Sequence, residues 1–281
     1  MNQRVSSSSC DTVMTDTGTP PPSSAATSAA NAVSAAGAPA DLTPPFTPRP
    51  LPDGLRAAII DLDGTMVDTA DDFTAALNGV LAGLGLTPIS RDEVVAYIGK
   101  GSERLIHDVL RARLSPTDAD AAFERACADY QHEYGKINGH YAHLYPEVAQ
   151  GLAALRGLGL KLACVTNKPE RFARALLERH DLARYFDAVF GGDSLARKKP
   201  DPLPMLTACA ALGATPQTTV AIGDSENDVA AARAAGLSSL TVPYGYNHGK
   251  PVQGLETDAI VNTLLDAARL LGHGRASVES M

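Results

Sequence analysis

Residues 57–65 read Ala57-Ala58-Ile59-Ile60-Asp61-Leu62-Asp63-Gly64-Thr65, an apolar run that ends in two acids and a glycine. A short apolar run that stops at such a turn predicts a buried strand of a parallel sheet, and open α/β sheets bind ligands at the carboxyl ends of their strands. Asp61 and Asp63 can then face one cavity, the first as nucleophile and the second as proton donor. Two carboxylates so close require a cation or a proton to coexist. An Asp-Gly pair is also common in ordinary turns. The segments further along the chain therefore decide whether this turn belongs to an active site.

Predicted strands and helices alternate along most of the remaining chain. We expect strands at 160–165, 188–190, 219–222, 239–242 and 259–261, and helices at 146–156, 170–179, 203–212, 228–235 and up to 271. Strands separated by helices imply parallel pairing through right-handed crossovers. The sequence therefore predicts an α/β fold with a doubly wound, Rossmann-like parallel sheet.

Residues 69–145 interrupt this alternation, because they contain predicted helices only. Thr69 with Asp72, and Ser90 with Glu93, have the spacing of a capping box at a helix start. Apolar residues follow each of them at helical spacing. We therefore expect an inserted, all-helical domain here.

The remaining boundaries follow from composition. Residues 1–52 are rich in Ser, Thr, Ala and Pro and lack periodic apolar residues, which predicts a disordered tail. Residues 275–281 are expected to be disordered too, so the catalytic core covers 53–68 and 146–274. The tail lacks the pattern of a secretory signal or transit peptide, and we expect a cytoplasmic protein.

Overall composition excludes several classes of function. The 281 residues are 44% apolar and 20% charged, with a net charge of -8, and the longest basic run is Arg197-Lys198-Lys199. This argues against a nucleic-acid partner. No apolar stretch approaches the roughly 18 residues that a membrane span requires. The four scattered cysteines indicate neither a zinc site nor a disulfide framework. The sequence leaves open whether the protein is a monomer or a homodimer.

Polar segments stand at the ends of four predicted strands or the loops after them, at 61–65, 166–167, 199–200 and 223–228. This set, in this order and with a helical insertion after the first segment, resembles the haloacid dehalogenase superfamily of phosphohydrolases. Longer phrases are most similar to its bacterial phosphoglycolate phosphatases: Thr166-Asn167-Lys168-Pro169, Gly191-Gly192-Asp193-Ser194, Lys198-Lys199-Pro200-Asp201-Pro202 and Val242-Pro243-Tyr244-Gly245-Tyr246-Asn247. The resemblance implies hydrolysis of 2-phosphoglycolate, a small phosphate ester, to glycolate and phosphate.

A metal ion suits this chemistry. A phosphate monoester dianion repels an attacking carboxylate, so positive charge is needed at the reacting oxygens. Mg²⁺ prefers hard oxygen ligands, and Asp61 and Asp224 are its natural carboxylate ligands. The resemblance implies that Asp63 adds its backbone carbonyl. Asn227 and Asp228 are expected to support the ion through bridging waters or by contacting the residues that bind it.

The other candidates would handle the proton and the phosphoryl group. Asp63 can protonate the leaving oxygen after an aspartyl-phosphate forms and then deprotonate the hydrolytic water. Thr166 and Asn167 offer a hydroxyl, an amide and backbone N–H groups to the phosphoryl oxygens, although both residue types are also favoured at helix N-caps. Lys199 is expected to neutralise the nucleophile. The Lys-Pro register favours it over Lys198.

Supporting roles are less specific. Gly64 permits a close approach or a positive φ, and Thr65 can hydrogen-bond within the turn. Ser225 is also a supporting candidate, with the alternative that it simply caps the following helix. The resemblance implies that the helical insertion at 69–145 is a cap domain that closes over the substrate. In this cap, Lys100 or Arg104 could bind a substrate carboxylate, or the loop that contains Lys100 could be a solvent-exposed turn.

Other functions remain alternatives at this point. A phosphomutase, or a phosphatase for another small ester such as a sugar phosphate, would use the same core. A catalytically idle binding protein is disfavoured, since every acid, hydroxyl and lysine that the reaction needs is present. The glycine-containing loop at 244–249 is expected to border the active site.

Overall fold

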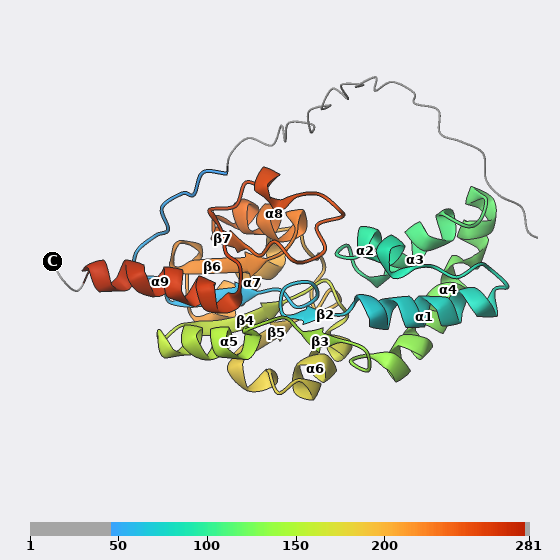
Figure 1. The fold of residues 1–281 in the computed structure, drawn as a ribbon, viewed down its shortest axis with the longest axis horizontal. Helices are drawn as coiled ribbons and strands as arrows, with labels where there is room; N and C mark the ends of the chain where they lie inside the picture. The colour runs from blue at the N-terminus through green and yellow to red at the C-terminus, as the bar shows by residue number, and fades with distance from the viewer. Residues whose placement is uncertain (1–45, 279–281) are drawn as a thin grey trace, which may run out of the picture. The chain divides into compact units, whose positions relative to one another are not determined.

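A six-stranded, all-parallel sheet forms the centre of the computed structural model, which describes residues 46–278 (Figure 1). In sheet order the strands are β5 (Ala188–Phe190), β4 (Lys161–Val165), β1 (Ala57–Ile60), β6 (Thr219–Gly223), β7 (Ser238–Thr241) and β8 (Ala259–Ile260). The chain runs from β1 through β4 to β5 on one side and then returns to β6 on the other. Ile60 pairs with both Cys164 and Ile222, so β1, β4 and β6 end side by side at this switch point. Ligands of such sheets bind there.

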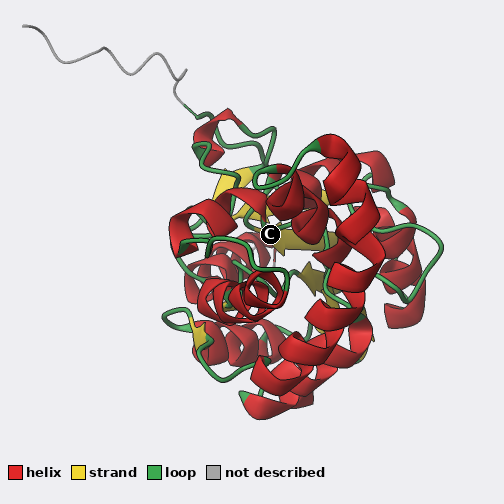
Figure 2. Ribbon diagram, turned by 90° about the vertical axis from the view of Figure 1, so that its right-hand side faces the viewer, coloured by secondary structure: helices red, strands yellow, loops and turns green. Residues whose placement is uncertain are grey.

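Helices cover both faces of the sheet, as Figure 2 shows. Alternate side chains of β1 point to opposite faces. Ala58 and Ile60 pack with one set of helices, α5 (Val148–Gly157), α6 (Glu170–Arg179) and α9 (Leu264–Val278). Ala57 and Ile59 pack with the other set, α7 (Leu203–Leu212) and α8 (Glu226–Ala235). The predicted doubly wound α/β fold is confirmed.

Four helices lie between two short strands that pair with each other, β2 (Val67–Asp68) and β3 (His143–Leu144). They are α1 (Ala70–Gly83), α2 (Arg91–Tyr97), α3 (Ser102–Arg111) and α4 (Pro116–Ile137). These helices share their own hydrophobic cluster, which also includes Phe172 and Tyr246 from the loops and helices of the sheet layer. Short 3-10 helices occupy Ala183–Tyr185, Pro216–Thr218 and Val252–Gly254.

The two expected capping boxes have different outcomes. Ser90 and Glu93 form theirs at the start of α2, as predicted. The capping box at the start of α1 is wrong, because Thr69 donates its hydroxyl to Asp63 at 2.7 Å and Asp72 accepts two backbone N–H groups just before β3. Both side chains thus form hydrogen bonds with residues outside the helix, and neither caps it.

The expected disorder of residues 1–52 falls on residues outside the described part, except at its end. There Arg49 forms an ion pair with Asp258 at 2.8 Å, and Leu51 packs against the core. The expected disorder of residues 275–281 also lies partly outside, and α9 includes the first residues of that segment. None of the described helices is both long and apolar enough to cross a membrane.

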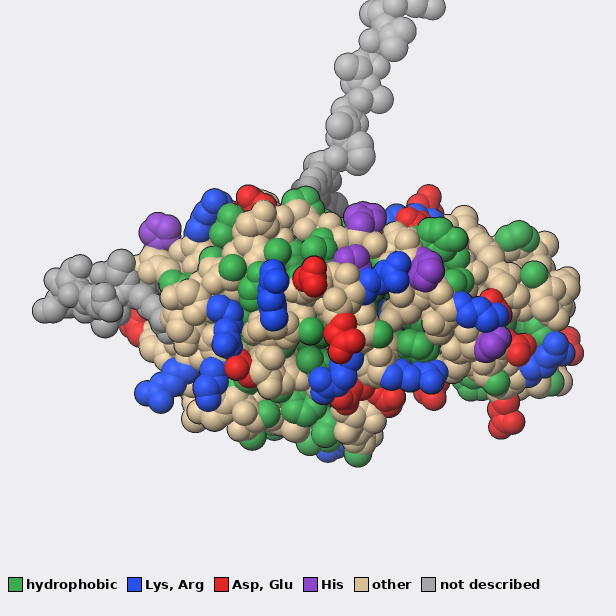
Figure 3. Space-filling view, turned by 90° about the horizontal axis from the view of Figure 1, so that it is seen from below, with side chains coloured by type: hydrophobic (Ala, Val, Ile, Leu, Met, Phe, Trp, Pro, Cys, Tyr) green, Lys and Arg blue, Asp and Glu red, His purple; other side chains and the backbone are tan. Residues whose placement is uncertain are grey.

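Charged side chains of both signs are interspersed on the face in Figure 3. A protein that binds nucleic-acid phosphates presents a continuous basic surface instead. On this face, Lys and Arg side chains are separated by acidic and uncharged ones instead of forming such a surface.

Candidate active site

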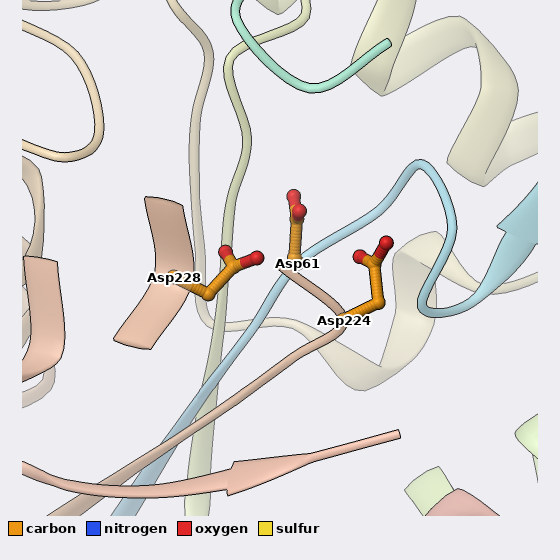
Figure 4. A group of neighbouring side chains, drawn as sticks. All are labelled: Asp61, Asp224 and Asp228. Atoms are coloured by element: carbon orange, nitrogen blue, oxygen red, sulfur yellow. The ribbon is translucent and has the colours of Figure 1, made fainter. Parts of the chain in front are cut away.

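Three carboxylates converge where β1 and β6 end (Figure 4). Asp61 directly follows β1, Asp224 directly follows β6, and Asp228 stands in the first turn of α8. One oxygen from each lies within 4.8 Å of the others. These oxygens could hold a metal ion, because hard divalent cations prefer carboxylate ligands.

The electrostatics of this cluster suit a cation. Burial, together with repulsion from Asp228, raises the pKa of Asp224 to about 7. Burial also holds the pKa of Asp61 well above its usual range, and the same neighbour adds to the shift. Two buried acids with raised pKa values, beside a third carboxylate, are a fitting set of ligands for a divalent ion, whose charge would favour their ionised forms.

Lys199 supplies the positive charge within the cluster. Its Nζ lies 2.9 Å from Oδ1 of Asp61 and 2.6 Å from Oδ1 of Asp228, and it also donates to the carbonyl of Val165. Burial alone would lower the lysine pKa, but the two carboxylates outweigh it and raise the pKa. Lys198, the alternative considered from the sequence, instead lies beside Gly101 of the helical insertion.

The loop after β1 fixes Asp224. Thr65 donates its hydroxyl to Oδ1 of Asp224 at 2.8 Å, and the backbone N–H of Tyr246 donates to Oδ2 at 2.6 Å. Gly64 has φ +85°, and a Cβ there would lie 2.4 Å from Oδ2. Only glycine allows this approach. The loop at 244–249 therefore borders the site, as the sequence predicts.

Asp63 lies beside the acidic cluster with different partners. Its Oδ1 accepts hydrogen bonds from Thr69 and from Nζ of Lys168, each at 2.7 Å, while Oδ2 has no hydrogen-bond partner among the described residues. The Lys168 side chain is only 1% exposed, and its ammonium lies 4.4 Å and 4.9 Å from the ring centroids of Phe73 and Tyr134. Lys168 belongs to the segment Thr166-Asn167-Lys168-Pro169, in which no local pattern indicates a role for it. A buried environment for this lysine was not visible from its neighbours in the sequence.

Thr166 and Asn167 lie at the end of β4 and line the same cavity as Asp61. The Thr166 hydroxyl accepts a backbone N–H two residues further on. The amide of Asn167 donates to the carbonyls of Lys199 and Gly99, each at 2.9 Å. The alternative that they cap a helix is wrong, because the residue before α6 is a proline and neither side chain caps it.

The residues after Asp224 combine two functions. Ser225 is the N-cap of α8 and forms a capping box with Asp228, so this interpretation from the sequence is confirmed. Asn227 donates to the carbonyl of Gly99 at 3.3 Å. The helix start thus presents Asp228 to Lys199 while its neighbour contacts the helical insertion.

Comparison with known proteins assigns the family. The family model for haloacid dehalogenase-like hydrolases matches residues 55–236. The chain belongs to this family. Among curated haloacid dehalogenase-like relatives, the phosphoglycolate phosphatases of Thiobacillus denitrificans and Nitrosospira multiformis are 42% and 45% identical to this chain over 222 residues. Each alignment covers 79% of this chain and 97% of the relative.

Similar solved structures support the same family assignment. A predicted phosphoglycolate phosphatase from Haemophilus somnus superposes with a TM-score of 0.72 at 29% identity, covering 77% of this chain and 98% of that one. CbbY from Rhodobacter sphaeroides in complex with phosphate superposes with a TM-score of 0.62 at 26% identity, covering 75% and 96%. The chain is therefore a phosphatase of the haloacid dehalogenase-like family.

In this haloacid dehalogenase-like hydrolase, the loop before α3 borders the cavity through Gly99 and Gly101. Lys100 and Arg104, the expected carboxylate ligands, do not line that cavity. Both face a separate, open hollow together with Lys198. Arg104 is exposed and bonded to a neighbouring acid on its own helix.

Proposed function

We propose that this phosphatase hydrolyses 2-phosphoglycolate to glycolate and phosphate through an aspartyl-phosphate on Asp61. The observation that carries the proposal is the convergence of Asp61, Lys199 and Asp224 from separate strand ends beside Asp63. The names of the relatives, phosphoglycolate phosphatases that align over 97% of their length, support the substrate.

The chemistry proceeds in two steps on these side chains. A carboxylate oxygen of Asp61 attacks phosphorus, and the bond from phosphorus to the glycolate oxygen breaks. Asp63 gives its proton to the departing oxygen, then takes a proton from the water that hydrolyses the acyl phosphate. Its Oδ2 is free for this exchange, since the described contacts engage Oδ1 only. Thr166 would donate its hydroxyl and Asn167 its backbone N–H to the phosphoryl oxygens, because the carbonyls of Lys199 and Gly99 already accept the two protons of the Asn167 amide.

Mg²⁺ is the proposed cofactor. Asp61 and Asp224 would hold the ion together with the backbone carbonyl of Asp63, while Asp228 and Asn227 support it. When bound, the ion supplies positive charge that offsets repulsion between the nucleophile and the phosphate. The burial and mutual repulsion of the carboxylates support this choice.

The proposal also covers the domain organisation, the location and the partners of the protein. We propose that residues 69–145 act as a cap over a core made of 53–68 and 146–274. We also propose a cytoplasmic monomer or homodimer that acts on small molecules and binds neither nucleic acid nor membrane. The described cysteines form no disulfide, which supports a reducing compartment.

A panel of phosphate esters assayed with Mg²⁺ tests the function. We expect phosphate release from 2-phosphoglycolate to be far faster than from glucose phosphates, and EDTA to stop it. Asp61→Asn should remove turnover while the circular dichroism spectrum stays unchanged. Equal rates on the sugar phosphates would contradict the proposed substrate, and turnover by a folded Asp61→Asn variant would contradict the nucleophile.

A further inference from the structure

The cavity beside Asp61 and Asp63 contains a single basic side chain among the described residues that line it, and this is Lys168. Most of the remaining lining is apolar or aromatic, including Phe73 and Phe172. A second anionic group on the substrate would meet the charge of Asp63 here. It therefore needs hydrogen-bond donors inside the cavity.

Two tyrosines that line the same cavity, Tyr130 and Tyr134, have buried hydroxyls without a hydrogen-bond partner among the described residues. Both project from α4, each about 1% exposed, with stacked rings whose centroids are 5.4 Å apart. Burial, and then the negative charges nearby, raise the pKa of both phenols, so each is a neutral donor. Leaving buried donors unpaired is costly, which indicates a missing partner.

Asp63 forms an ion pair with Lys168 in the same cavity. Its charge contributes to the raised pKa of both phenols, and its Oδ1 lies 2.7 Å from the Lys168 Nζ. The Lys168 ammonium also lies over the ring of Tyr134. An ammonium has three protons to donate, so the ion pair with Asp63 leaves it further donors.

We propose that Lys168 and the hydroxyls of Tyr130 and Tyr134 bind the carboxylate of the substrate. The inference rests on the proposed function and assigns its selectivity to these three side chains instead of Lys100 and Arg104. A carboxylate here would bridge a lysine from the loop after β4 and two tyrosines from the helical insertion. An ester without that carboxylate would leave both phenols unpaired.

Paired substrates test this assignment. The selectivity ratio is kcat/KM for 2-phosphoglycolate divided by kcat/KM for ethyl phosphate, which lacks the carboxylate. Since hydrogen bonds to charged groups are the strong ones, we expect Tyr130→Phe and Tyr134→Phe each to lower this ratio by about tenfold or more. Activity on ethyl phosphate should fall less than activity on 2-phosphoglycolate, because neither hydroxyl bonds Asp63. Tyr97→Phe, a cap tyrosine outside the cavity lining, is the matched control and should keep the ratio.

Lys168→Met adds a second measurement. This lysine also holds Asp63, so turnover of both esters should fall, and the loss should be at least about tenfold larger with 2-phosphoglycolate. Thermal melting confirms that each variant is folded.

The possible failures are distinguishable. If the wild-type enzyme does not prefer 2-phosphoglycolate to ethyl phosphate, the proposed function is wrong. The proposed carboxylate site is then wrong too. If the wild-type preference is strong and both tyrosine variants retain it, the carboxylate site is wrong while the function stands.

Discussion

The Nζ of Lys199 lies 2.9 Å from Oδ1 of Asp61, and these side chains are 2% and 12% exposed. A carboxylate in this position is costly to ionise without a partner. Lys199 therefore favours the charged form of Asp61, against the burial and the neighbouring carboxylates that raise its pKa, and it stands where negative charge would accumulate during phosphoryl transfer.

Replacing this lysine should disable catalysis. Removal of one preorganised charge from an active site costs about 100-fold to about 1000-fold in kcat, and we expect a loss of this size for Lys199→Met with 2-phosphoglycolate. The neighbouring Lys198→Met is the control, with a rate within about threefold of wild type. The reverse result, with the larger loss at Lys198, would refute the assignment.

A methyl group at Gly64 should be tolerated poorly. Gly64→Ala places a Cβ 2.4 Å from Oδ2 of Asp224 on a backbone with positive φ, so we expect turnover to disappear and the free energy of unfolding to fall by about 1–2 kcal/mol or more. Gly85→Ala separates the two effects, because φ is +69° there and nothing lies within 4 Å of the added carbon. That control should lose stability but keep its rate. An active Gly64→Ala enzyme would contradict the described geometry.

The requirement for Mg²⁺ should depend on pH. Burial and Asp228 raise the pKa of Asp224 to about 7 in the metal-free protein, and metal binds the deprotonated carboxylate. Protons therefore compete with the ion below about pH 7. We expect the Mg²⁺ concentration for half-maximal activity to fall between about pH 6 and about pH 8. A constant value across this window would argue against Asp224 as a ligand.

The same shift predicts a change in stability. The folded state holds this proton more tightly than the unfolded chain, so the metal-free protein should lose stability as pH rises from about 4 towards about 7. Thermal melting in EDTA measures this loss. Added Mg²⁺ should raise the melting temperature more at pH 8 than at pH 6.

Tyr246 should matter for folding as well as for the site. Its hydroxyl accepts the backbone N–H groups of Thr69 and Ala70 and donates to Asp68. Tyr246→Phe leaves two buried N–H groups without this acceptor, and we expect the free energy of unfolding to fall by about 1–3 kcal/mol in urea titrations. Tyr244→Phe, which loses one bond to a carbonyl, should cost about 1 kcal/mol. A larger loss at position 244 would reverse this ranking.

Local signals were sufficient for much of the fold. The helix expected at 203–212 matches α7, because Pro202 and Pro204 stand at its start and Gly213 ends it in the left-handed conformation. The strand end at Asp61 followed from an apolar run and a turn, which are both local. The convergence of Asp61 with Asp224 was predictable because parallel strands end at a common edge.

Other parts of the site depend on contacts that no local pattern encodes. Thr69 and Asp72 have the spacing of a capping box, yet distant partners take both side chains. In the sequence, Tyr130 and Tyr134 have the spacing of an ordinary apolar stripe of a helix. Lys168 looks like a single charged residue in a loop. Their shared cavity exists only after the insertion folds against the ends of the strands, so three-dimensional structure was needed to find it.

The chain passes between the sheet layer and the helical insertion twice, and β2 and β3 join these two passages by backbone hydrogen bonds. Any rotation of the insertion must therefore bend both passages at one place. Water would enter, and glycolate would leave, through the same concerted displacement. If the proposed cap opens and closes in each cycle, the rate at which this paired linker flexes would limit turnover, however fast the bonds to phosphorus are made and broken.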